Sequence, residues 1–457
     1  MCWQKKEGMV RWSILGITTL TGVFLCLSFP HWDRHLLSMG RYHRFEDFSS
    51  ELRGSGWFDA LWAGPSKLAK YQTEAELVYY GDGIGGFTTV MKIVNVFGVN
   101  EYLLINSGKG DASTRGDMPT QTLLAHLPLL LHPDPQEVLV VGLASGITAG
   151  EVLHYPIERL DIVEISDQVV TASDFFIPWN KSVLSDPRTE LIIQDARAHL
   201  ELTDRTYDVI IAEPSNPWMA GLANLFTTEA FLLARKRLRG NGIFVQMFHS
   251  YQMDWFTFAL VGRTFSEVFP NSILAVTYPS APGTIRGSND YLMIGVKGER
   301  QLLFTDENEN SVYTEQSKNI ALSDPRLLAR LVVSEDLQKL FGPGPLHTDN
   351  NPLLEFSAPK QMYIDDLAIE ETIMSNGWLS QETRALLAEI AGVEDQIAFS
   401  AFALSVFQPF YNMVVLDKAT LPQRNRLYNL VENYCAHSPI DDYSLFADPG
   451  LREKCIV

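Results

Sequence analysis

Residues 137–166 carry the feature that most constrains the fold, and they read EVLVVGLASGITAGEVLHYPIERLDIVEIS. An apolar β run leads into a glycine-rich turn, then a helical stretch, then a second β run that ends at Glu164. Gly142, Ser145 and Gly146 lie in the turn, where backbone can approach a ligand closely, and a carboxylate at the next strand tip can accept from ribose hydroxyls. Because Ala144 stands where a strict dinucleotide fingerprint has glycine, the turn alone is also explained by packing.

Two further acids follow later β runs in the same way. Asp195 comes directly after LIIQ, and Glu213 ends the run YDVIIAE before a proline-rich loop. The carboxyl ends of parallel strands meet at one edge of an open α/β sheet, which is where such folds bind ligands. The pattern therefore predicts a Rossmann-like domain and an S-adenosylmethionine (AdoMet)-type cofactor. No cluster has the spacing of metal ligands, so we expect no metal.

Composition and charge exclude several classes of protein. The chain has 457 residues, enough for two or three domains, and a net charge of −19. Such a charge argues against nonspecific nucleic-acid binding, which needs clustered lysine and arginine. The four cysteines are expected to be reduced thiols, because they match neither a metal-site nor a disulfide spacing.

The stretch Trp12–Phe29 contains no charged residue. As a helix it would be roughly 27 Å long, about the hydrocarbon thickness of a bilayer. We therefore expect a single membrane span; a secretory signal and a buried core helix are the alternatives. The globular part is expected in the cytoplasm, because AdoMet-type cofactors are cytoplasmic metabolites.

The hydrophobic pattern predicts an α/β protein with several parts. We expect a membrane anchor over 1–30, a linker over 31–75, a small antiparallel β-sheet domain over 76–120 and the Rossmann-like domain over 121–298. An extension over 299–365 and a helical tail over 366–457 follow. Within the extension, residues 324–341 have a helical pattern, and the segment with Asp349 is predicted to form a closing strand.

The motifs from about Val78 to Gly298 together resemble the spermidine synthases, a family of polyamine aminopropyltransferases. The similarity is greatest to a membrane-associated branch of that family, and it rests on TQTLLAHLPLLLHPDPQEVLVVG, VEIS, QDARAHL and LFTTEAF. The resemblance implies decarboxylated AdoMet or AdoMet as cofactor. It assigns cofactor contacts to Gln121, Gly142, Ser145, Gly146, Glu164 for the ribose, Asp195 for the adenine, and Ala196. It makes Glu213 the acid at the reacting centre.

Three departures from the family pattern concern the acceptor site. Ser145 replaces an aspartate of the glycine turn, and Glu213-Pro-Ser-Asn-Pro217 replaces Asp-Ser-Ser-Asp-Pro. Thr120 and Thr122 stand where a tyrosine and a glutamate flank the matching glutamine. Each lost acid removes a charge-assisted hydrogen bond worth roughly 1.5–3 kcal/mol. Our interpretation is that the amine site has lost much of its negative charge.

The function expected first is aminopropyl transfer to a small amine in polyamine biosynthesis. In it, Glu213 anchors the amine and accepts a proton. Asn216, Trp218 and Tyr251 are candidate substrate contacts, whereas His249 is expected to be structural. A second copy of the chain, in a homodimer, is a further expected partner.

Two other functions stay open. Asn216-Pro217-Trp218 also fits an AdoMet-dependent methyltransferase that holds a planar nitrogen with an amide and a ring. A noncatalytic, membrane-tethered module that binds a nucleoside is the alternative of another class.

Overall fold

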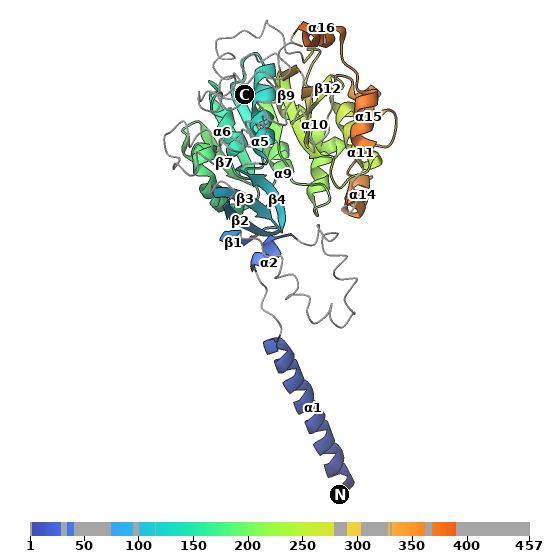
Figure 1. Ribbon diagram of the computed structural model, residues 1–457. Helices are drawn as coiled ribbons and strands as arrows, with labels where there is room; N and C mark the ends of the chain where they lie inside the picture. Colours follow the sequence, from blue (N-terminus) through green and yellow to red (C-terminus); the bar gives the residue numbers. More distant parts are fainter. Residues whose placement is uncertain are drawn as a thin grey trace, which may run out of the picture.

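Two β-sheets and the helices around them form the body of the protein (Figure 1). The computed structural model describes residues 2–28, 34–40, 75–94, 100–114, 116–277, 290–302, 328–329, 331–361 and 368–389. The larger sheet has eight strands in the order β12-β10-β11-β9-β8-β5-β6-β7. Their bounds are β5 Glu137–Val141, β6 Arg159–Glu164, β7 Thr189–Ile193, β8 Tyr207–Ala212, β9 Leu238–His249, β10 Ser272–Val276, β11 Asp290–Val296 and β12 Val332–Ser334.

The strand order of this sheet reverses at β5: β6 and β7 follow on one side of β5, and β8 and the later strands lie on the other side. Strands β5, β6 and β7 are parallel neighbours on one side, and β8 and β9 continue the parallel sheet on the other. Strand β11 then inserts antiparallel between β9 and β10. The central strands are mostly apolar, and β8 is buried along its whole length, because helices cover both faces. This arrangement confirms the predicted Rossmann-like domain.

Helices follow most of the parallel strands, as the sequence predicted. The segments TQTLLAHLPLLLH and TTEAFLLARKRL lie largely in α5 and α10. All residues of α5 are buried, which agrees with its mostly apolar sequence. The helices are α5 Met118–Leu131, α6 Ile147–Val152, α7 Asp167–Ser173, α8 Ile177–Asn180, α9 Ala196–Leu202, α10 Thr228–Arg237, α11 Trp255–Val268, α13 Leu337–Phe341, α14 Leu353–Gln361, α15 Ala368–Asn376 and α16 Gln381–Glu389.

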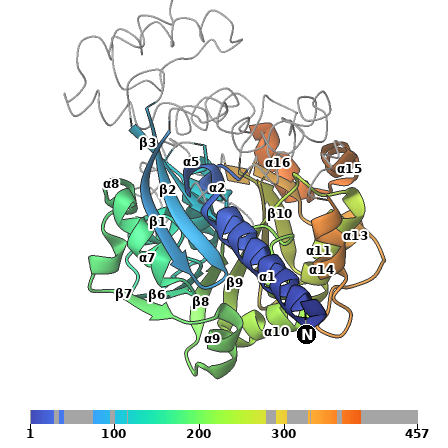
Figure 2. The ribbon, with the colours of Figure 1, turned by 90° about the horizontal axis from the view of Figure 1, so that it is seen from below.

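The smaller sheet is the predicted antiparallel domain, and it has four strands. It consists of β1 Glu76–Gly83, β2 Gly86–Val94, β3 Asn100–Asn106 and β4 Lys109–Ser113, in that order. Val90 and Leu104 of this sheet share a buried cluster with Ile147 and Phe176 of the larger domain. In Figure 2 the sheet lies beside α7. This contact places β4 next to the carboxyl edge of the parallel strands.

The extension differs from its predicted structure in two places. Residues 324–341 do not form one helix, because Val332–Ser334 pairs with β10 as strand β12 and only Leu337–Phe341 is helical. The adjacent β-branched Val332 and Val333 suit this sheet edge. The expected closing strand is instead a short Thr348–Asn351 bridge followed by α14. Of the predicted tail, α15 and α16 are described, and residues beyond 389 lie outside the described part.

Helix α1, Cys2–Ser28, stands apart from both sheets in Figure 1. It contains most of the predicted span, and its large apolar side chains, such as Trp12, Leu20 and Phe24, are exposed. Among the described residues, however, no helix reaches the combination of length and hydropathy that crossing a bilayer requires. The helix is therefore confirmed and the membrane span is not.

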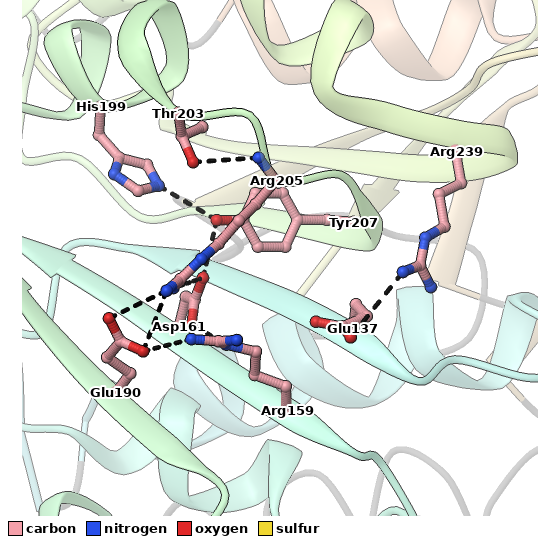
Figure 3. A network of polar contacts seen from close by, with 9 residues as sticks. All are labelled: Glu137, Arg159, Asp161, Glu190, His199, Thr203, Arg205, Tyr207 and Arg239. Atoms are coloured by element: carbon pink, nitrogen blue, oxygen red, sulfur yellow. Dashed lines mark hydrogen bonds and ion pairs between the residues drawn. The ribbon is translucent and has the colours of Figure 1, made fainter.

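A buried ionic cluster ties together the starts of β6, β7 and β8, at the sheet edge opposite the strand tips (Figure 3). Asp161 is fully buried and accepts from Arg159 Nε, Arg205 Nη1 and the Tyr207 hydroxyl, each at 2.8 Å. Both arginines also pair with Glu190, whose side chain is 47% exposed. These donors hold the pKa of Asp161 below its usual value although burial acts to raise it.

We expect Asp161→Asn to lower the free energy of unfolding by about 3 kcal/mol, because it removes one partner of a buried charge cluster. The matched control Glu190→Gln, at the exposed end of the same cluster, should cost less than about 1 kcal/mol. Urea denaturation of both variants measures the difference. Equal losses would show that burial of Asp161 does not decide its contribution.

Candidate active site

The turn after β5 and the end of β8 approach each other at the point where the sheet changes direction. The backbone nitrogen of Glu213 donates to the Val141 carbonyl at 3.1 Å. Gly142 has φ +91°, and a Cβ there would lie 3.0 Å from the Glu213 carbonyl oxygen. A side chain at position 142 would therefore strain the backbone and press on β8. The same point is where open α/β sheets bind ligands.

The predicted ribose ligand is buried at the tip of β6. Glu164 Oε2 accepts from the Leu143 backbone nitrogen at 2.9 Å, and Oε1 accepts from Ser166 at 2.9 Å. Burial raises the pKa of Glu164, and these backbone hydrogen bonds oppose the rise. The carboxylate is thus held in one orientation at the glycine turn.

Two predicted cofactor contacts, Gln121 and Ser145, bind each other. The Ser145 hydroxyl donates to Gln121 Oε1 at 2.5 Å, and Gln121 Nε2 donates to the Ser113 carbonyl at 2.9 Å. Both side chains are buried. This contact connects α5 with the turn that ends at Gly146, whose φ is +77°.

The predicted adenine ligand lies one strand further along the same edge. Asp195 is exposed and caps α9 by accepting from the Ala198 nitrogen at 2.9 Å, and Ala196 is the first residue of that helix. Glu164 pairs in register with Ile193 at the end of β7, two residues before Asp195. The acids at the tips of β6 and β7 therefore border one surface, which fits an adenosine lying across it.

A cavity of about 250 Å³ adjoins this edge, between the small sheet and the ends of β8, β9 and β11. Carboxyl groups dominate its polar lining: Asp111, Asp117, Glu213 and Asp290. Its other lining residues are Lys109, Gly110, Gly116, Pro119, Thr120, Met247, His249, Tyr251 and Thr277. The composition suits a small cationic ligand.

One of these acids is neutralised by a lysine. Lys109 Nζ lies 2.8 Å from Asp111 Oδ1, and both side chains are largely buried. Asp111 also accepts from Ser215 Oγ at 2.5 Å and from Asn106 Nδ2 at 2.7 Å. The ion pair raises the pKa of Lys109 although burial acts to lower it. Asp117, Glu213 and Asp290 are the other carboxyl groups on the cavity wall.

Glu213, the predicted acid at the reacting centre, lines the cavity. Its Oε2 accepts from the Thr148 hydroxyl at 2.7 Å. Burial raises the pKa of Glu213 to about 8; the Thr148 hydrogen bond opposes this, and neighbouring carboxylates, above all Asp117, add to it. Glu213 is therefore mostly protonated at pH 7 when the cavity holds no cation. An ammonium group would favour the ionised form.

Asp290 binds a histidine on the wall of the same cavity. Its Oδ1 lies 2.7 Å from His249 Nδ1, and its Oδ2 accepts from the Thr120 hydroxyl at 2.6 Å. Burial acts to raise the pKa of Asp290, but these hydrogen bonds hold it below its usual value. Burial raises the pKa of Asp117, which lies close by at the start of α5.

The three predicted substrate contacts have different positions. Tyr251 lines the cavity and donates from its hydroxyl to Asn216 Oδ1 at 3.1 Å. Asn216 is fully buried behind it, and Trp218 packs in the hydrophobic core. Neither of these two lines the cavity, because the loop after Glu213 turns inward. Within the described residues, no group of three or more histidine, cysteine or acidic side chains is arranged to hold a metal ion.

The interpretation that the amine site has lost much of its negative charge did not take into account three further acids on the cavity wall. Asp111, Asp117 and Asp290 supply carboxylates from positions that sequence reasoning did not consider. Asp290 is the first residue of an antiparallel strand, and its register partner is His249, the last residue of β9. A search for acids that begin a strand, as well as acids that end one, could have found it.

Comparison with known proteins gives two kinds of relative. The sequence profile of the spermine/spermidine synthase domain matches residues 118–289. A polyamine aminopropyltransferase of Bacillus mycoides (strain KBAB4) is 31% identical over 239 residues, which cover 50% of this chain and 84% of the relative. Putrescine N-methyltransferase 1 of Nicotiana tabacum is 29% identical over 268 residues, covering 55% of this chain and 68% of the relative. A solved structure, a spermidine synthase in complex with the transition-state analogue AdoDATO, aligns with a TM-score of 0.43 and 21% identity, over 52% of this chain and 84% of that one.

The raised pKa of Glu213 predicts a pH-dependent stability. A carboxyl whose pKa is higher in the folded state stabilises the fold fully below its unfolded pKa of about 4.3 and loses this effect as pH rises through about 8. The melting temperature of the ligand-free protein should therefore fall, relative to Glu213→Gln, between pH 5 and pH 8. Thermal unfolding of both proteins across pH 5–9 measures this. Parallel curves would contradict the raised pKa.

Proposed function

Because the chain belongs to the spermine/spermidine synthase family, we propose that it transfers the aminopropyl group of decarboxylated AdoMet to a small amine. The observation that carries the proposal is the cavity with its four carboxyl groups beside the turn after β5. A cationic acceptor needs such a lining, and a nucleoside cofactor needs the strand edge next to it.

The cofactor's adenosine would lie along the tips of β6 and β7. Glu164 is oriented by two backbone nitrogens and would hold the ribose, and Asp195 with Ala196 would border the adenine. Gly142 and Gly146 let the turn approach the nucleoside closely. When bound, the sulfonium supplies an activated carbon next to its positively charged sulfur.

The acceptor would bind in the cavity with its ammonium group near Glu213. Opposite charge lowers the pKa of a buried carboxyl, so the arriving cation ionises Glu213 and pairs with it. Asp117 adds negative potential, whereas the Lys109–Asp111 pair contributes little net charge. These side chains position the amine. Removal of water from the cavity strengthens their electrostatic attraction to it.

Methyl transfer from AdoMet is the second candidate, and Ser145 favours it. Decarboxylated AdoMet carries an amine that a carboxylate would bind well, but Ser145 is neutral and its hydroxyl is already used by Gln121. The similarity to a putrescine N-methyltransferase supports the same chemistry. The four carboxyl groups of the cavity argue against the noncatalytic module, because a weakened acceptor site was one of the reasons to consider it.

An assay that offers putrescine with each cofactor tests the proposal. We expect an aminopropylated product from decarboxylated AdoMet, in excess over any methylated product from AdoMet, when both are identified by mass spectrometry. Glu213→Gln should lower turnover by at least about 100-fold, because it cannot pair ionically with the amine.

The same variant serves as its own binding control. Its affinity for the cofactor, measured by calorimetry, should stay near that of the wild type, because Glu164 and Asp195 are unchanged. A product formed only from AdoMet would show that the protein transfers a methyl group and not an aminopropyl group. Near-normal turnover by Glu213→Gln would show that Glu213 does not act at the reacting centre.

A membrane location, with the globular domain in the cytoplasm, is also proposed. It is supported by the charge-free stretch Trp12–Phe29 and by the exposed apolar side chains of α1. The full chain should sediment with membranes and resist alkaline carbonate extraction. Leu15→Lys combined with Leu20→Lys should release it, whereas Ile84→Lys, in the turn between β1 and β2 and about as exposed as Leu20, should not. Recovery of the wild type in the soluble fraction would refute the location.

A further inference from the structure

We propose that His249, held by Asp290, is the base that takes the proton from the acceptor's ammonium group. The proposal rests on the proposed function and changes one part of it: Glu213 anchors the amine, and the proton moves to a histidine on another strand. Asp290 and Thr120 act as positioning residues, because they touch the histidine and its partner rather than the reacting atoms.

The geometry leaves one nitrogen of His249 available. The side chain is 4% exposed, lines the cavity and ends β9. Nδ1 is bound to Asp290 at 2.7 Å, while Nε2 is buried and has no hydrogen-bond partner among the described residues. A buried polar nitrogen without a partner is costly. A ligand amine in the cavity would supply the missing hydrogen bond.

The partner of Nδ1 determines what Nε2 can do. A carboxylate beside Nδ1 keeps the hydrogen on that nitrogen and leaves a lone pair on Nε2. Asp290 is itself fixed by the Thr120 hydroxyl at 2.6 Å, and Thr120 also lies 3.0 Å from the Thr277 hydroxyl. The carboxylate stays ionised, so it would stabilise the imidazolium that forms when Nε2 accepts a proton.

The groups around His249 also favour the histidine, rather than Glu213, as the proton acceptor. Tyr251 packs on the ring, with centroids 4.7 Å apart, and the cavity wall adds Asp117, Glu213 and Lys109. Burial keeps Glu213 mostly protonated before the amine arrives, so Glu213 is a poor acceptor at that stage. The imidazole of His249 instead presents Nε2, which has no hydrogen-bond partner among the described residues.

The proton and electron balance is simple. The ammonium gives one proton to Nε2 and becomes a neutral amine with a free electron pair. That pair forms the new nitrogen–carbon bond while the carbon–sulfur bond breaks and its electrons stay on sulfur. The positive charge of the sulfonium passes to the newly alkylated nitrogen, the sulfur becomes a neutral thioether, and the imidazolium later releases its proton to solvent.

Kinetics of His249→Gln test the proposal, with His132→Gln, a histidine in the loop before β5, as the matched control. At pH 7 the variant should lose about 10²–10⁴-fold in kcat and keep its affinity for the cofactor. The loss should shrink by about tenfold or more towards pH 10, where the acceptor amine loses its proton without help. Asp290→Asn should shift the acid limb of the wild-type rate profile to lower pH, because the imidazolium loses its counter-charge.

Several outcomes would overturn the proposal. A loss of kcat in His249→Gln that is equal at pH 7 and pH 10 would indicate a structural role for the histidine. A loss of kcat under about threefold would indicate that the histidine has no role in the reaction. An unchanged acid limb in Asp290→Asn would remove Asp290 as the positioning residue.

A second measurement does not depend on turnover. In protein with 15N-labelled histidine, His249 should carry its hydrogen on Nδ1, and its Nε2 resonance should move when putrescine is added. If the wild type turns over neither cofactor, the proposed function fails. The titration would still show whether His249 Nε2 contacts the amine. An Nε2 resonance that does not change when putrescine is added would refute the proposed role of His249. Hydrogen found on Nε2 alone would also refute it.

Discussion

The close approach of β5 and β8 is the constraint on which the rest of the site depends. Hydrogen bonding of the Glu213 nitrogen to Val141 brings the end of β8 to the start of the glycine turn, and Gly142 has no side chain to hold them apart. The turn that would receive the nucleoside and the acid that faces the amine are therefore parts of one backbone contact. Glu164 extends the same edge by binding the turn at Leu143.

Electrostatics divide the cavity into a paired and an unpaired region. Lys109 neutralises Asp111, and His249 binds Asp290, whereas the side chain of Glu213 accepts from the Thr148 hydroxyl alone among the described residues. Burying several carboxyl groups together is costly, and the cost is expressed as raised pKa values for Glu213 and Asp117. A cationic ligand relieves this repulsion, so the cavity is most stable with an amine inside.

The parallel part of the fold could be predicted because it is encoded locally. Apolar runs that end on acids, followed by helical stretches, identified the strands that end at Glu164 and Glu213. The prediction failed where tertiary contacts overrode local pattern. Val332–Ser334 looked helical and became an edge strand, since pairing with β10 outweighed its weak helical preference.

The sequence by itself determined the nucleotide-type sheet edge, the order of its acids and the family to which they belong. Only the tertiary structure decided the charge of the acceptor cavity and the position of its histidine. Asp111, Asp290 and His249 lie far apart along the chain, and they meet because β11 runs antiparallel to β9 and the small sheet packs beside both. Local patterns report which residues end a strand, whereas the neighbours across a sheet depend on how distant strands pair.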